Sequence, residues 1–353
     1  MISLCMIVRD EESNLEKCLL SVRDYIDEII IVDTGSKDRT KEIASKYTKY
    51  IYDFKWNNDF AKARNFSISK ASNSWVLILD ADEVVSELDF YTVLNFCKKD
   101  SALVGRINII NEYEDQHGIK RYTKQINRFF NKNFYKYEGI IHEQLVAKDK
   151  QQYIAENLPI TLQHIGYSKE VVNKKNKIER NISLLLDSIE QKDNDPYLYY
   201  QLGKSYFMAK KFKESSINFE KAIDLIDNFY YEYAEDLVES YGYSLLNIRL
   251  YEKALVIKDY NKYYLNSADF KFLIAMIEMN NGNFQRAAET FLECTSYREG
   301  KIEGITTFLP LYNIGVIFEA LGFEDEALKY YEMCGEYRAA KERINSLKGE
   351  INY

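Results

Sequence analysis

The stretch Trp75-Val76-Leu77-Ile78-Leu79-Asp80-Ala81-Asp82 decides the fold of the first half of the chain. Its apolar run predicts a strand that is buried on both faces, as in a parallel sheet. Two carboxylates, Asp80 and Asp82, end the run abruptly. Ligands of open α/β sheets bind outside the carboxyl ends of the strands, so we expect these acids to face a pocket. Their oxygens suit Mg²⁺ or Mn²⁺, and an ordinary acidic turn is the alternative interpretation.

Segments with strand-like and helix-like patterns alternate around this stretch. Strands are expected at residues 2–8, 28–32, 50–54, 75–79, 104–110 and 125–130, and helices at 12–22, 38–46 and 60–71. A strand–helix alternation of this kind is typical of a mostly parallel, doubly wound sheet. The first half of the chain is therefore predicted to be an α/β domain.

Long helical patterns replace the strands from about residue 171 onward. One segment resembles a tetratricopeptide repeat at nearly every signature position, namely Tyr199, Leu202, Gly203, Tyr206, Phe212, Ser215, Phe219 and Ala222. Further copies are expected at 242–254, 274–294 and 314–334. Helix pairs of this type bury their apolar faces against neighbouring pairs. We therefore predict two domains, an α/β domain over 1–168 and an all-α helical repeat domain over 169–353.

Composition and charge narrow the class of protein. The 353 residues are 46% hydrophobic, which supports a substantial core. The formal net charge of −8 argues against a protein that binds nucleic acid mainly through phosphate contacts. Five cysteines without paired spacing indicate reduced thiols, so a cytoplasmic location is expected. No apolar run of the length of a transmembrane helix occurs.

Four ordered blocks in the first half resemble the family 2 glycosyltransferases, which have a GT-A fold. These blocks are Met6–Glu12 with Leu15, Cys18, Leu19 and Ser21; Ile31–Ser36 with Asp38 and Thr40; Asn58–Ala61 with Ala63, Arg64 and Asn65; and Leu79–Glu83. Together with the repeats, they resemble a subgroup that glycosylates bacterial peptides and proteins, such as the S-glycosyltransferases of glycocin biosynthesis. Relatives in that subgroup build bacterial surface polysaccharide. The resemblance implies a metal-dependent, inverting transferase that uses a nucleotide sugar, expected to be UDP-linked.

Three residues are candidates for binding the nucleotide sugar. Asp33 ends the second predicted strand, where its carboxylate can accept a hydrogen bond from a uracil N–H or a ribose hydroxyl. Capping of the following turn is the alternative role of Asp33. Arg64 offers a planar fork of donors for the base or the diphosphate, and a surface ion pair with Asp59 is its alternative. The resemblance favours Arg64 at the donor site and adds Arg9, directly after the first strand.

The resemblance also divides the two acids at the end of the apolar run. It assigns Asp80 mainly to the ribose and the metal environment, and Asp82 to direct coordination of Mg²⁺ or Mn²⁺. His164 can complete the metal shell or touch the diphosphate as a neutral imidazole. A structural role at the junction with the helical half is the alternative for His164.

Inverting transfer requires a general base within hydrogen-bond reach of the acceptor. His142-Glu143 resembles the acceptor-side block of the subgroup, and we predict Glu143 as the base, with His142 as the second choice. Asp59 and Glu138 remain alternatives. Arg128 can support the phosphates of the leaving group or close a strand edge.

The predicted function is therefore transfer of a sugar from a UDP-sugar to a side chain of a peptide or protein. The repeats would recruit this acceptor or form a homodimer, because concave repeat surfaces bind extended chains. Transfer to a surface polysaccharide or a lipid-linked glycan is the alternative within the same class. A catalytically inactive repeat scaffold is the alternative from another class.

Overall fold

The structure is a computed structural model that describes residues 1–115, 118–165 and 171–349. The chain divides into two compact units. The first comprises Met1–Tyr113 and Arg121–Asn173, and the second comprises Glu114–Lys120 and Lys174–Tyr353. The predicted domain boundary between residues 168 and 169 lies outside the described residues and stays a prediction.

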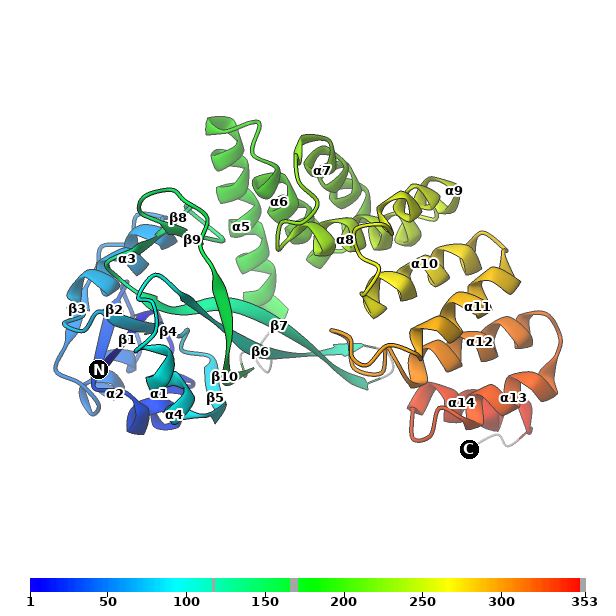
Figure 1. Cartoon of the computed structure of the whole chain (residues 1–353), viewed down its shortest axis with the longest axis horizontal. Helices are drawn as coiled ribbons and strands as arrows, with labels where there is room; N and C mark the ends of the chain where they lie inside the picture. The colour runs from blue at the N-terminus through cyan, green and yellow to red at the C-terminus, as the bar shows by residue number, and fades with distance from the viewer. Residues whose placement is uncertain (116–117, 166–170, 350–353) are drawn as a thin grey trace. The chain divides into compact units, whose positions relative to one another are not determined.

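A mixed sheet of eight strands forms the centre of the first unit (Figure 1). Its order is β3-β2-β1-β4-β7-β6-β10-β5. The strands are β1 (Ile2–Val8), β2 (Glu28–Asp33), β3 (Ile51–Asp53), β4 (Trp75–Ile78), β5 (Glu83–Leu88), β6 (Val104–Asp115), β7 (Gly118–Asn131) and β10 (Ala155–His164). The strands β3, β2, β1 and β4 are parallel, β7 runs antiparallel to β4, and β5 runs antiparallel to β10.

Helices cover both faces of this sheet, which explains why β4 is apolar at every position. They are α1 (Leu15–Val22), α2 (Thr40–Ser45), α3 (Phe60–Lys70) and α4 (Phe90–Phe96). On one face, Leu4 and Met6 of β1 share a core with residues of α1, α2 and α4. On the other face, Cys5 shares a core with residues of α3 and of a two-stranded sheet. That small sheet pairs β8 (Tyr135–Glu138) with β9 (Gln144–Ala147).

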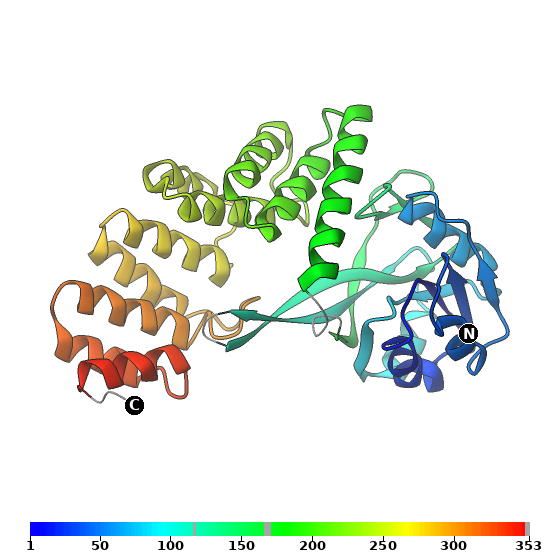
Figure 2. The ribbon, with the colours of Figure 1, turned by 180° about the vertical axis from the view of Figure 1, so that it is seen from behind.

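The second unit consists of consecutive helices, which Figure 2 shows from behind. They are α5 (Val171–Gln191), α6 (Pro196–Met208), α7 (Phe212–Leu225), α8 (Ala234–Asn247), α9 (Tyr251–Ala254), α10 (Ala268–Asn280), α11 (Phe284–Cys294), α12 (Phe308–Ala320), α13 (Glu324–Glu332) and α14 (Arg338–Leu347). A 3₁₀ helix at Leu255–Tyr260 follows α9.

The repeats pack as the signature residues predict, with small residues where two helices approach. A Cβ added to Gly203 of α6 would lie 2.5 Å from the Phe219 ring of α7. A Cβ added to Gly315 of α12 would lie 2.6 Å from the Tyr331 ring of α13. Both aromatic side chains are fully buried. The predicted α/β domain with helical repeats is therefore confirmed.

The sequence predicted no definite element for residues 83–96 or for residues 134–164. The structure has β5 and α4 in the first of these segments, and β8, β9 and β10 in the second. The strand β5 pairs with β10 alone at one end of the sheet. This strand matters for the site, since it begins directly after Asp82.

Candidate active site

Three predicted site residues lie at one edge of the sheet because β2, β1 and β4 are adjacent and parallel. Asp33 is the last residue of β2 and pairs in register with Val8, the last residue of β1. Arg9 follows β1 directly, and Asp80 follows β4 after a single residue. The edge is the one at which open α/β sheets bind ligands.

Asp33 has one satisfied and one unsatisfied carboxylate oxygen. Its Oδ1 accepts hydrogen bonds from the backbone N–H groups of Gly35 at 2.9 Å and Ser36 at 3.0 Å. Gly35 has a φ of 111°, which suits the tight turn. Asp33 is only 2% exposed, and its Oδ2 is buried without a hydrogen-bond partner among the described residues. Leaving such an acceptor unpaired costs about 1–3 kcal/mol, so this oxygen is a candidate contact for a ligand donor.

Two arginines hold the carboxylate of Asp80. Arg64 Nη2 lies 3.2 Å from Oδ1, and Arg128 Nη2 lies 3.0 Å from Oδ2. Burial alone would raise the pKa of Asp80, but the charges of Arg128 and Arg64 outweigh it and hold that pKa below its usual range. Asp80 is therefore a carboxylate with a partner on each oxygen.

Glu83 completes this buried charge cluster from the start of β5. Its Oε2 accepts the backbone N–H of Asp80 at 2.8 Å, and its Oε1 lies 3.6 Å from Arg128 Nη2. Burial raises the pKa of Glu83 to about 7, with Arg128 opposing this rise and Asp80 adding to it. Glu83 thus fixes the backbone at the start of the Asp80-Ala81-Asp82 turn.

Asp82 and His164 form a pair that β5 and β10 bring together. Glu83 and His164 are register partners in these antiparallel strands, and the Ile165 backbone N–H donates to the Asp82 carbonyl at 2.8 Å. His164 Nε2 lies 2.9 Å from Asp82 Oδ2, and His164 Nδ1 lies 3.1 Å from Asn111 Oδ1. Each of the two paired side chains is between a fifth and a quarter exposed.

The chemistry of this pair fits a divalent cation. A carboxylate oxygen and an imidazole nitrogen already face each other, and a ligating histidine commonly donates its other N–H to an oxygen such as that of Asn111. No group of three or more potential metal-ligating side chains occurs within 1–115, 118–165 and 171–349. Mg²⁺ often binds only one or two carboxylates together with phosphate oxygens, so a small protein ligand set is sufficient.

Glu143 lies on the other side of the arginine pair. Arg64 Nε donates to Glu143 Oε1 at 2.7 Å, and the Glu143 side chain is 11% exposed. The adjoining His142 has a positive φ of 50°, in the turn between β8 and β9. Arg64 therefore links a predicted donor-side acid, Asp80, to the predicted base.

The other predicted residues near the site have simpler surroundings. Arg9 is exposed, and its Nε lies 3.8 Å from Oδ2 of Asp10. Asp59 caps α3 by accepting the Lys62 backbone N–H at 2.9 Å. The ion-pair partner of Asp59 is also Lys62, at 3.0 Å, and not Arg64. The surface ion pair between Arg64 and Asp59 is thus a wrong expectation, because Arg64 faces into the protein.

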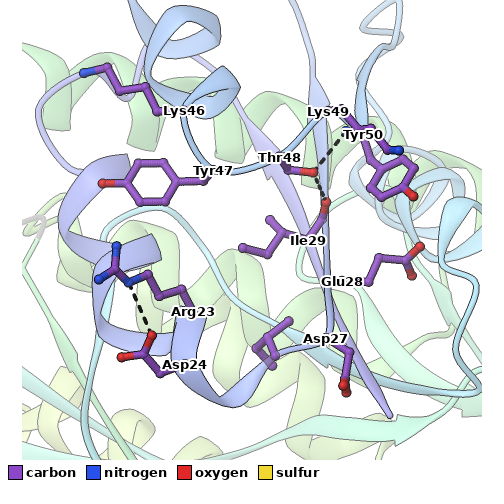
Figure 3. Close-up of a pocket in the computed structure, with 11 residues that line it drawn as sticks. Arg23, Asp24, Asp27, Glu28, Ile29, Lys46, Tyr47, Thr48, Lys49 and Tyr50 are labelled. Atoms are coloured by element: carbon purple, nitrogen blue, oxygen red, sulfur yellow. Dashed lines mark hydrogen bonds and ion pairs between the residues drawn. The ribbon is translucent and has the colours of Figure 1, made fainter.

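A pocket of about 490 Å³ lies at the opposite edge of the sheet (Figure 3). Its lining includes Asp27 and Ile29 near the amino end of β2, and Arg23, Tyr47 and Tyr50 from the adjoining segments. None of the predicted site residues lines it. The acids at the carboxyl edge therefore remain the candidate active site.

Comparison with known families agrees with this geometry. Residues 3–146 match the model of glycosyl transferase family 2, and residues 196–229 and 268–300 match the tetratricopeptide repeat. The chain carries a family 2 glycosyltransferase domain followed by tetratricopeptide repeats. Both resemblances stated from the sequence are confirmed. The matched glycosyltransferase range contains every predicted site residue except His164.

Three relatives have names that mention either tetratricopeptide repeats or a glycosyltransferase. A TPR repeat-containing protein of Synechococcus elongatus is 34% identical over 210 residues, which are 57% of this chain and 51% of that protein. The SPbeta prophage-derived glycosyltransferase SunS of Bacillus subtilis is 26% identical over 238 residues, 64% of this chain and 53% of SunS. An uncharacterized glycosyltransferase of Rickettsia typhi is 26% identical over 190 residues, 50% of this chain and 64% of that protein. The chain spans about half the length of the first two relatives.

Sequence reasoning missed several residues of this glycosyltransferase domain. Asn111 received no role, because only the pairing of β6 with β10 brings it beside His164. Glu83 was grouped with the acidic motif but not recognised as a buried partner of Arg128. Asn65 belonged to a motif block, but its hydrogen-bond partner Tyr137 lies 72 residues further along the chain. Membership of a motif block could have pointed to Glu83 and Asn65, whereas nothing in the sequence around Asn111 indicated a role.

Proposed function

We propose that the protein is a metal-dependent, inverting glycosyltransferase that uses a UDP-sugar. The observation that carries this proposal is the buried, unsatisfied Oδ2 of Asp33 at the edge where Asp80 and Asp82 lie. A buried acceptor without a donor suits the N–H of a pyrimidine base or a ribose hydroxyl. The family 2 domain supports the use of a nucleotide-sugar donor.

Each residue of the edge has a proposed role. Asp33 accepts a hydrogen bond from the nucleoside, and Arg9 lines the exposed side of the donor site. Asp80 contributes to the ribose and metal environment while its two arginines hold it in place. Asp82 and His164 would hold Mg²⁺ or Mn²⁺, which supplies Lewis-acid stabilisation of the departing diphosphate.

Glu143 is the proposed general base for the acceptor. A base must lie within hydrogen-bond reach of the proton that it removes, and Glu143 presents a partly exposed carboxylate beside the donor-side acids. The acceptor heteroatom bonds to the anomeric carbon as its proton passes to Glu143, and the bond from that carbon to the diphosphate breaks with release of UDP. His142 is the second candidate for this role.

The proposed acceptor is a side chain of a peptide or protein. The tetratricopeptide repeats support this proposal, since arrays of this kind bind extended chains. The repeats would recruit the acceptor or form a homodimer, and the mass of the protein in solution separates the second role from the first. None of the helices within the described residues is long and apolar enough to span a membrane. All five cysteines are free, which supports the proposed location in the cytoplasm.

The test compares wild type with Asp82→Ala in UDP binding and UDP-sugar hydrolysis with Mn²⁺. We expect the variant to lose about 100-fold or more in hydrolysis, as removal of a metal ligand from a metal-assisted reaction would cause. Asp24→Ala is the matched control, because Asp24 is an exposed acid at the opposite edge of the sheet. Equal hydrolysis by all three proteins would contradict the metal site, and no binding of UDP to wild type would favour the scaffold alternative.

A further inference from the structure

Three residues of helix α3 contact the segment that carries Glu143. The Phe60 backbone N–H donates to the Ile140 carbonyl at 2.8 Å. Asn65 makes two hydrogen bonds with the backbone of Tyr137, one to its carbonyl and one from its N–H, each 2.8 Å long. Arg64 adds the ion pair with Glu143. The first two turns of α3 therefore hold residues 137–143.

The turn that precedes Glu143 needs such support. Gly139 has a φ of 106°, and a Cβ at this position would lie 3.4 Å from Cα of Glu143. His142 adopts a positive φ of 50°, which is uncommon for a residue other than glycine. A backbone in this conformation persists when surrounding contacts determine it.

The guanidinium of Arg64 is enclosed on several sides. Its side chain is only 7% exposed, its Nε contacts Glu143 and its Nη2 contacts Asp80. Its Cζ lies 5.4 Å from the centre of the Tyr137 ring, within cation–π range. Nη1 is buried and has no hydrogen-bond partner among the described residues. A donor diphosphate would have to displace Asp80 or Glu143 to reach Nη2 or Nε.

We propose that Arg64 is a positioning residue for Glu143 and does not itself bind the nucleotide sugar. Burial opposes the charge on Arg64, but Asp80 and Glu143 favour it, so the guanidinium stays charged and anchored between the two acids. Its Nε–H fixes one oxygen of Glu143, and no described residue hydrogen-bonds the other oxygen. Asn65 and Phe60 fix the backbone of the same segment. The inference rests on the proposed function and replaces the donor-binding role expected of Arg64.

The kinetic test uses Arg64→Lys, which keeps the charge but removes the planar fork of donors. UDP-glucose, UDP-galactose and UDP-N-acetylglucosamine serve as donors, with water as the acceptor. We expect kcat for hydrolysis to fall about tenfold or more while KM for the donor changes by less than about twofold. A tenfold rise in KM at unchanged kcat would overturn the inference, because it would place Arg64 on the donor.

A double variant separates positioning from a general effect on stability. If Arg64 acts through Glu143, Arg64→Lys combined with Glu143→Gln should be no slower than Glu143→Gln alone, within about twofold. Multiplied losses in the double variant would contradict the inference. Lys70→Gln is the matched control, since Lys70 is an exposed cation at the other end of α3.

Amide hydrogen exchange tests the same inference without a substrate. Arg64→Lys should speed exchange in residues 139–145 about threefold or more and leave β1 and β4 unchanged. Asn65→Ala, which keeps the charges of the site, should act in the same direction. Unchanged exchange in both variants would overturn the inference. Absence of hydrolysis in wild type would contradict the proposed function instead, because exchange reports on Arg64 alone.

Discussion

At the scale of single residues, the site depends on carboxylates in very different surroundings. Asp80 has an arginine on each oxygen, whereas Asp33 has a buried oxygen without a partner among the described residues. Asp82 faces an imidazole. The residue type is the same in each case, and the different neighbouring side chains support the different proposed roles.

The first prediction concerns Asp33. Asp33→Asn can keep an oxygen for the turn but replaces the other oxygen with a donor group, which opposes a nucleoside N–H. Loss of a hydrogen bond to a charged group, about 1.5–3 kcal/mol, predicts UDP binding weakened about 10- to 100-fold. Calorimetry with UDP measures this change, and Asp53→Asn on β3 is an exposed control. Undiminished affinity in Asp33→Asn would remove this residue from the donor site.

A second prediction concerns Asn111. Its oxygen lies 3.1 Å from His164 Nδ1 and can orient the imidazole. Asn111→Ala should weaken Mn²⁺ binding in the presence of UDP about 10- to 100-fold, as outer-shell substitutions do. Titration followed by electron paramagnetic resonance reports the free Mn²⁺. Asn108→Ala, on the same strand, should bind Mn²⁺ as wild type does.

At the scale of elements, close approach of helices limits what the repeats tolerate. Gly203→Ala would place a methyl group 2.5 Å from the rigid ring of Phe219. Such overpacking costs about 1–3 kcal/mol of stability. This cost outweighs the gain of at most about 1 kcal/mol from the higher helix propensity of alanine. Urea denaturation should therefore show a less stable variant. Lys221→Ala, at an exposed position of α7, should change stability by less than about 0.5 kcal/mol.

Strand pairing also decides how much of the site a sequence can predict. The acids at the carboxyl ends of β4 and β2 were predictable because parallel neighbours end at the same edge. The partner of Asp82 was only a candidate, since His164 lies 82 residues away and reaches it through the antiparallel pair of β5 and β10. The sequence pattern of β5 was too weak to predict that pair.

At the scale of the whole molecule, one buried and one partly buried acid in the second unit link stability to pH. Lys301 Nζ lies 2.8 Å from Glu235 and 3.3 Å from Glu239. Burial raises the pKa of Glu239 well above its ordinary value; Lys301 opposes the rise, and the nearby acids Glu235, Asp236 and Asp269 add to it. Burial acts in the same direction on Glu235, but there Lys301 outweighs it and the pKa is lowered.

These opposite shifts predict opposite pH dependences. With a raised pKa, folded Glu239 binds more protons than the unfolded chain, so its contribution to stability falls as pH rises above about 4.5. Wild type should therefore lose stability relative to Glu239→Gln over that rise. Relative to Glu235→Gln, wild type should instead lose stability as pH falls below about 4.5, because the contribution of a lowered pKa is lost there. Urea denaturation between about pH 3 and pH 8 covers both ranges, and slopes of the same sign with rising pH would contradict the assignment.

Patterns along the chain were enough to predict the α/β fold, the helical repeats and the acids at the strand ends. These features follow from periodicity and from neighbours along the chain, which are local properties. Only the tertiary structure decided which groups meet: Arg64 with Glu143, 79 residues apart, and His164 with Asp82 and Asn111. The physical reason is that a buried charge takes its partner from whichever element packs beside it. Strand order and helix docking set those neighbours, and no local pattern records them.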